Sequence, residues 1–89
     1  MAVLLVTFRL QDRLKIYDDL FAAIEEFPNA RISSTTYLID TDDPPSDVYN
    51  DLREYISVPM DTLLVLSVSW PWHGRGPSDL LDWMLQRCR

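Results

Sequence analysis

The residues best suited to recognition chemistry lie in one short, turn-rich segment, Trp70 to Pro77 (WPWHGRGP). Aromatic rings and arginine are enriched at interaction hot spots, and both also stack on unpaired bases. Trp70, Trp72, His73 and Arg75 are therefore candidate binding residues. We favour covering of a sheet face or self-association over a protein partner, and a protein partner over nucleic acid.

Patterns typical of catalysis or metal binding are sparse. His73 is the single histidine and Cys88 the single cysteine, so an internal disulfide framework and a cysteine-based zinc site are ruled out. Asp40, Asp42 and Asp43 have the spacing of oxygen ligands for a hard cation, but the glycine and the distal glutamate of a calcium loop are missing. We interpret these acids as a solvated loop and a helix cap.

The overall charge argues against a dedicated nucleic-acid binder. Eight basic residues against fourteen acidic ones give a net charge of −6, whereas nucleic-acid-binding domains usually present a basic face. The acids concentrate in residues 40–54, and three bases lie within residues 1–15. A local basic patch is therefore compatible with an acidic protein, although a solubilising surface is the simpler interpretation.

The length of 89 residues predicts one domain over residues 1–89, with a core over 2–70 and a C-terminal loop and helix over 71–89. The core of so short a chain is thin, and a dimer interface would add to it. No apolar run approaches the ~18 residues of a membrane span, and the segment MAVLLVTFRL has no basic leader. We therefore expect a cytoplasmic protein without a membrane partner.

Hydrophobic periodicity predicts the elements that position these residues. Apolar and β-branched runs predict strands over 2–8, 31–40 and 62–69. Apolar residues at helical spacing predict helices near 12–27, 45–57 and 78–89, with Asp12, Asp43 and Ser78 as N-caps. The last helix is expected to bury Leu81, Met84, Leu85 and Cys88.

The segment 31–40 forms either one long strand or two short strands bent near Ser33-Ser34. Spacing alone does not decide, because no Asn-Gly or Asp-Gly turn marks a hairpin. With a hairpin, the order becomes the α+β, ferredoxin-like βαββαβ plan with a four-stranded antiparallel sheet and an added C-terminal helix. Strands this apolar predict that the second sheet face is also covered, by that helix or by a second subunit.

A family resemblance supports this plan. The stretch Ser34 to Asp42 (STTYLIDTD) resembles the S-T-W-L-V-D-T-D block of small ferredoxin-like proteins that are similar to CRISPR-associated protein two and to the SinR-like group. Residues 52–56 (LREYI), 61–65 (DTLLV) and 72–74 (WHG) resemble further blocks of that group in the same order. The resemblance spans residues 3–74 and implies a ferredoxin-like fold, a bend at Ser33-Ser34 and a homodimer.

One departure from the family pattern bears on activity. In the nuclease-like members, strand one ends in an aspartate in a Y-D-L setting, and one carboxylate from each subunit can hold a divalent metal for phosphodiester cleavage. The aligned residues here are Phe8-Arg9-Leu10. A guanidinium cannot ligate a metal or act as a base, but it can contact a phosphate or a carboxylate. Arg9 is therefore a candidate binding residue.

The sequence thus predicts a non-catalytic homodimer that acts by binding or regulation, as an accessory subunit of a defence or toxin-like system, with no cofactor. A protein partner is compatible with it, and a nucleic-acid partner is less favoured. The alternative is a metal-dependent endonuclease that acts on RNA or DNA with magnesium. Asp12, Asp40 and Asp42 are the weak metal-ligand candidates for that alternative.

Overall fold

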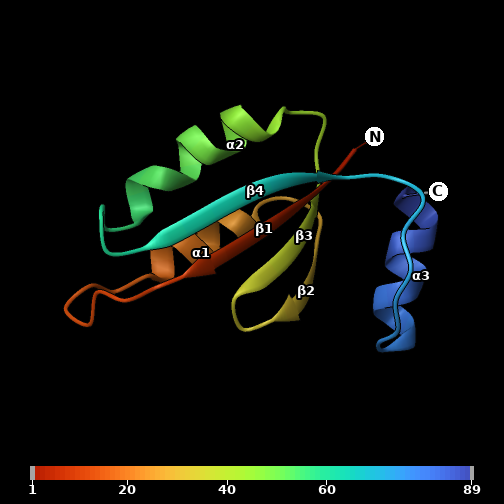
Figure 1. Cartoon of the computed structure of the whole chain (residues 1–89), viewed down its shortest axis with the longest axis horizontal. Coiled ribbons are helices and arrows are strands. Elements are labelled where there is room, and N and C mark those ends of the chain that lie inside the picture. The colour runs from red at the N-terminus through yellow and green to blue at the C-terminus, as the bar shows by residue number, and fades with distance from the viewer. Residues whose placement is uncertain (1, 89) are drawn as a thin grey trace.

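The computed structural model describes residues 2–88 of the chain and forms a four-stranded sheet with three α-helices (Figure 1). The elements in chain order are β1 (Val3–Arg9), α1 (Asp18–Glu25), β2 (Asn29–Ser33), β3 (Thr36–Asp40), α2 (Pro45–Leu52), a 3-10 turn (Arg53–Tyr55), β4 (Thr62–Val68) and α3 (Ser78–Arg87). This order agrees with the predicted one, including the added C-terminal helix.

The sheet is antiparallel throughout and has the strand order β2-β3-β1-β4. The segment 31–40 is a hairpin, as the resemblance implies, but its bend lies at Ser34-Thr35, one residue after the expected Ser33-Ser34. Its first strand begins two residues earlier than predicted, at Asn29. Strand β1 lies between β3 and β4, so that Val3 faces both Asp40 and Val68. The two edge strands are β2 and β4.

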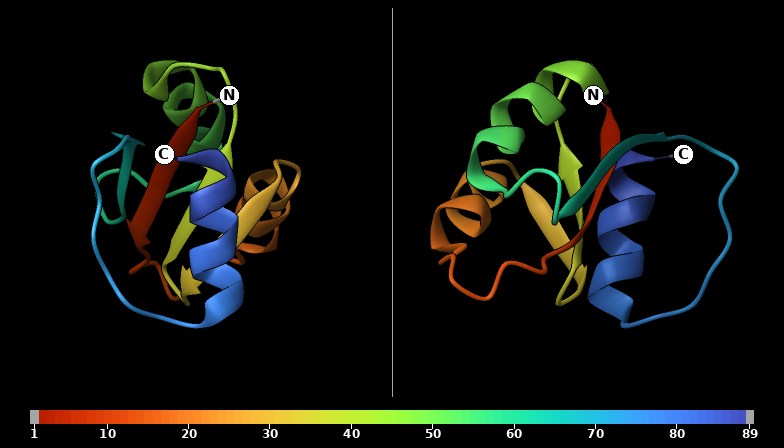
Figure 2. Two further views of the ribbon diagram at one scale, coloured as in Figure 1. Left: turned by 90° about the vertical axis from the view of Figure 1, so that its right-hand side faces the viewer. Right: turned by 60° about the vertical axis from the view of Figure 1, so that its left-hand side comes forward.

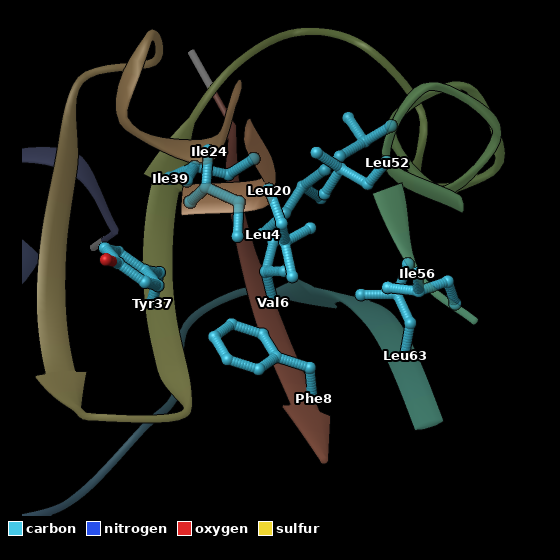
Figure 3. Packing of buried hydrophobic residues seen from close by; sticks show 11 residues of the cluster. Leu4, Val6, Phe8, Leu20, Ile24, Tyr37, Ile39, Leu52, Ile56 and Leu63 are labelled. Carbon is cyan, nitrogen blue, oxygen red and sulfur yellow. The ribbon is translucent and has the colours of Figure 1, made fainter. Parts of the chain in front are cut away.

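The helices lie on both sides of the sheet. Helices α1 and α2 cover one face, and α3 packs on the opposite face (Figure 2). The main core fills the space under α1 and α2 with side chains from both helices and from three strands (Figure 3). Its buried residues are Leu4, Val6, Phe8, Leu20, Ile24, Tyr37, Ile39, Val48, Leu52, Ile56 and Leu63. The smaller cluster under α3 contains Val3, Leu38, Met84 and Cys88.

Helix α1 is shorter than the sequence predicts. It begins at Asp18 rather than near residue 12, because Tyr17 directs its hydroxyl to the carboxylate of Asp61 and has a non-helical backbone. The prediction that Asp12 caps this helix is therefore wrong. The side chain of Leu14, which lies within the predicted helix near 12–27, is 98% exposed. Asp18 and Asp19 form the acidic first turn that the helix dipole favours.

The other two helices also begin differently from the prediction. Pro44 precedes α2 with an extended backbone, and Pro45 is its first helical residue, which suits a residue with no amide hydrogen to satisfy. In α3, Pro77 takes the capping position and Ser78 is already helical. No side chain within residues 2–88 caps either helix, so the predicted capping roles of Asp43 and Ser78 are wrong.

Helix α3 buries a different stripe from the predicted one. Met84 and Cys88 are buried as expected, but Leu81 is half-buried and Leu85 is 44% exposed. Leu80 and Trp83 pack against the α3 cluster instead. The helix is rotated toward Trp83, whose ring lies 4.3 Å from the guanidinium carbon of Arg87.

The second sheet face is covered only in part. Helix α3 lies over the end of the sheet that contains Val3 and Leu38. Further along β4, Leu64 and Leu66 point to the same side and are 54% and 47% exposed. The expected covering is therefore incomplete in the single chain. No helix among residues 2–88 is both long enough and apolar enough to cross a bilayer.

Candidate functional site

Three of the predicted binding residues line one cavity. Trp72, His73 and Arg75, in the loop between β4 and α3, border a hollow of about 260 Å³ between that loop, α3 and the sheet. The floor is formed by apolar side chains of the sheet, and one wall is formed by Leu80, Leu81 and Met84 of α3. The apolar floor and the polar rim of the hollow are features of small-molecule sites in general.

The indole of Trp72 holds the loop against the end of α3. Its Nε1–H donates a hydrogen bond to the carbonyl oxygen of Cys88 at 2.5 Å, and its ring meets the ring of Trp70 edge to face at 6.1 Å. The Sγ–H of buried Cys88 points to the carbonyl oxygen of Val68 at 3.4 Å. Cys88 is therefore a packed side chain, and Trp70, which is 57% exposed, is the outward-facing member of the pair.

Arg9 does not join this group. It pairs with Thr62 at one end of β1, whereas Trp70 follows Val68, which pairs with Val3 at the other end. Six strand residues at about 3.3 Å each separate the two ends by roughly 20 Å. The predicted binding residues thus lie in two places, with Arg9 alone at the far end of the sheet.

Near Arg9, the carboxylate of Asp61 binds two loops together. It accepts hydrogen bonds from the backbone amide of Gln11 at 2.7 Å, the hydroxyl of Tyr17 at 2.6 Å and the backbone amide of Ser57 at 2.8 Å. A second link joins the same loops, because the hydroxyl of Ser57 donates to the carboxylate of Asp12 at 2.7 Å. Sequence reasoning missed this network, since its partners are far apart in the chain.

Desolvation and these hydrogen bonds together shift the pKa values of Asp61 and Tyr17. Desolvation alone would raise the pKa of Asp61, but the amide and hydroxyl donors outweigh it and hold the pKa of that carboxyl below its ordinary value. Partial burial raises the pKa of the Tyr17 hydroxyl, and its bond to Asp61 raises it further. Tyr17 therefore stays protonated as the donor, and Asp61 stays ionised as the acceptor.

The weak metal-ligand candidates are not brought together. Asp12 accepts from the amide of Leu14 and from Ser57, and Asp40 binds the guanidinium of Arg87 at 3.0 Å at the opposite end of the sheet. Asp42 follows Asp40 and is therefore also remote from Asp12. Among residues 2–88, no three His, Cys, Asp or Glu side chains converge as a metal site requires. The absence of a cofactor remains a prediction.

The structure reveals exposed apolar residues that the sequence did not single out as sites. Leu64 and Leu66 alternate with the inward-facing Leu63 and Val65, so that the apolar run in β4 has two apolar faces. The two loops joined by Asp61 project beyond the sheet (Figure 1). They expose a second group of apolar side chains. Its members are Leu14, Ile16, Val58 and Met60. The uninterrupted apolar run in β4 was the one available signal.

Fold and surface together define a small α+β protein with an open antiparallel sheet, one partly covered sheet face and a cavity beside a tryptophan-rich loop. Comparison of the chain with protein-family models, with curated proteins and with solved structures gives no match.

Proposed function

We propose that the chain is a ferredoxin-like, homodimeric protein of the CRISPR-associated-protein-two-like type that acts by binding rather than by catalysis. The strand order β2-β3-β1-β4 with α1 and α2 on one face supports the ferredoxin-like assignment. The proposal depends above all on the exposed leucines of β4, because a monomer rarely leaves such a strand uncovered. The accessory role in a defence or toxin-like system rests on the sequence resemblance.

Strand β4 lacks the features that keep edge strands from pairing. Natural edge strands are blunted by charges, prolines, bulges or covering elements. The other edge, β2, has an irregular register between Arg31 and Ser33 and carries the charge of Arg31. By contrast, β4 (TLLVLSV) has seven residues with no charge and no proline. Within residues 2–88 it pairs only with β1, and its outer edge is therefore suited to a further strand.

A second copy of the same strand fits this edge. Two β4 strands can pair antiparallel about a two-fold axis centred on Val65. Leu64 then lies beside Leu66 of the partner subunit, and Leu66 lies beside Leu64 of the partner subunit. Because the strand carries no charge, no like charges are opposed in this pairing. The same register places Met60 opposite Trp70 of the partner subunit. These two residues are 50% and 57% exposed in the single chain.

The area that a stable interface buries indicates that residues outside β4 also take part in the proposed dimer. A stable interface buries about 800 Å² per partner, and this chain exposes 6011 Å² in total. One pair of seven-residue strands supplies only a fraction of such an interface. The flanking side chains Met60 and Trp70 therefore contribute to the proposed interface.

A binding role is also consistent with the side chains near the end of β1. In the resemblance described above, Arg9 aligns with the position of the nuclease carboxylate. The two nearby acids, Asp12 and Asp61, already accept hydrogen bonds on both of their carboxylate oxygens. These bonds join two loops to each other, and this supports the assignment of both acids to loop structure.

A pair of matched substitutions tests the assembly. We expect Leu64→Glu to convert the dimer to a monomer, because it opposes an ionised carboxylate to the apolar Leu66 of the partner subunit. Leu85→Glu introduces the same charge at an exposed position of α3 and should leave the dimer intact. Size-exclusion chromatography with light scattering reads both variants. Equal masses for the two variants would contradict the proposed interface.

A further inference from the structure

The hollow beside the tryptophan-rich loop combines an apolar floor with a cationic rim. Ile32 of β2 forms part of the floor and is 45% exposed, a high value for an aliphatic side chain in a strand. Leu5 and Leu38 continue the floor toward the centre of the sheet. Water in contact with this floor is displaced favourably by an apolar group.

The charge at the rim determines which polar group a ligand carries, if its apolar part lies on the floor. His73 and Arg75 are the titratable or charged side chains that line the hollow, and within residues 2–88 no acid lines it. The guanidinium of Arg75 is permanently charged and presents a planar fork of donors that matches a carboxylate. The whole chain carries a net charge of −6, and its field therefore penalises a dianion more than a monoanion.

The hollow is open to solvent, and its volume sets the size of the ligand portion that it can surround. About 260 Å³ corresponds to roughly nine water-sized volumes of ~30 Å³ each. A ligand of roughly eight to ten non-hydrogen atoms fits that space. A neighbouring hollow of about 400 Å³, on the β2 side of α3, has both Arg31 and Asp79 in its lining and offers no such preference for one sign of charge.

We infer that the cavity between the 69–77 loop, α3 and the sheet binds a small amphiphilic monocarboxylate, with its apolar chain on Ile32 and Leu5 and its carboxylate at Arg75. This inference rests on the proposed binding role and gives it a ligand class. It does not depend on the dimer, because Leu64 and Leu66, which carry the dimer, are not part of the cavity lining.

Octanoate is a suitable probe, since it has ten non-hydrogen atoms and one carboxylate. It is titrated into ¹⁵N-labelled full-length protein while the indole Nε1–H signal of Trp72 is followed, because Trp72 lines the cavity and its Nε1–H donates to Cys88. We expect a saturable shift with a dissociation constant on the order of 0.1 to 1 mM, as befits so small a ligand. Octanol, with the same chain but no charge, should bind more weakly.

Two arginine variants complete the test. Arg75→Gln should weaken octanoate binding about fivefold or more, and Arg53→Gln, at an exposed site outside the cavity, should leave it unchanged. Equal effects of the two variants, no saturable shift up to ~10 mM, or shifts centred on Leu64 and Leu66 would overturn the inference. Inorganic phosphate that binds as well as octanoate would also overturn it. Light scattering on the same samples reports the dimer separately, so that either proposal can fail alone.

Discussion

At the scale of single residues, Asp61 has the most concentrated set of contacts near the end of β1. Its carboxylate joins residues 10–17 to residues 57–61 through two backbone amides and one hydroxyl. Tyr17 donates to it directly before α1 begins. The start of α1 is therefore determined by a residue 44 positions away in the chain, and this contact explains why the helical pattern that begins near residue 12 does not form a helix there.

Replacing Asp61 tests this role through the pH dependence of stability. Because hydrogen bonds hold the folded-state pKa below the unfolded value of about 3.8, the ionised group stabilises the fold above that value. The contribution is lost as the pH falls through the folded pKa. Asp61→Asn should lower the free energy of unfolding by about 1 kcal/mol at pH 6, a value reduced for its solvent exposure. The deficit should shrink below about pH 4.

Urea unfolding at several pH values measures this deficit. Asp43→Asn, at an exposed loop position, is the control and should change stability by less than about 0.5 kcal/mol at each pH. A deficit for Asp61→Asn that stays constant down to pH 3 would show that the ionised carboxylate is not responsible.

Arg9 and Asp12 bear on the catalytic alternative. Phosphodiester cleavage at neutral pH needs a bound cation or a positioned base, and we expect no magnesium-dependent cleavage of RNA or DNA by this chain. Arg9→Asp should abolish any weak nucleic-acid binding without producing turnover. Incubation of labelled RNA and DNA with and without magnesium checks for turnover, and gel-shift titration of the same nucleic acids checks for binding. Magnesium-dependent cleavage that is lost on chelation and absent in Asp12→Ala would instead assign a metal ligand to Asp12.

At the scale of elements, the sequence predicts which helices and strands exist and in what order. It predicts less well where they begin and end and which of their faces is buried. The pattern of apolar segments correctly predicts the three helices, β1 and β4, because burial of those segments is a local pattern. It indicates strand structure over residues 31–40 but does not decide between one strand and the hairpin that the structure contains. It places Leu14 on a helix and Leu85 in the core, and both predictions are wrong. In the first case, the contact of Tyr17 with the distant Asp61 lies directly before the start of α1. In the second case, α3 packs Leu80 and Trp83 against the sheet cluster and leaves Leu85 exposed. The cavity at Trp72 likewise could not be predicted from the sequence, because α3 forms one of its walls.

The rotation of α3 gives a direct test at this scale. Met84 is 7% exposed and packs against the sheet, whereas Leu85 is 44% exposed. Met84→Ala should cost about 2–3 kcal/mol of unfolding free energy, and Leu85→Ala should cost less than about 1 kcal/mol. Guanidinium unfolding followed by tryptophan fluorescence compares the two variants. Similar losses of unfolding free energy for the two variants would show that Leu85 is buried, as the periodicity predicts. They would contradict the observed rotation of α3.

At the scale of the whole molecule, the sheet is the organising element. One face is closed by α1 and α2 over the main core, and the other is closed by α3 at one end only. The exposed leucines of β4 lie between the tryptophan-rich loop at one end of the strand and the loops joined by Asp61 at the other. We propose that two copies pair along this open edge despite a net charge of −6, because β4 itself carries no charge.

The mass of the protein in solution tests the central claim most directly. Sedimentation equilibrium of the unmodified chain at ~100 μM should give twice the chain mass of 10.4 kDa, because an obligate dimer is assembled well below that concentration. Dilution should lower the apparent mass toward that of one chain only at much lower concentration. A single species of 10.4 kDa at ~100 μM would contradict the account, because the open edge of β4 would then have no second copy to pair with.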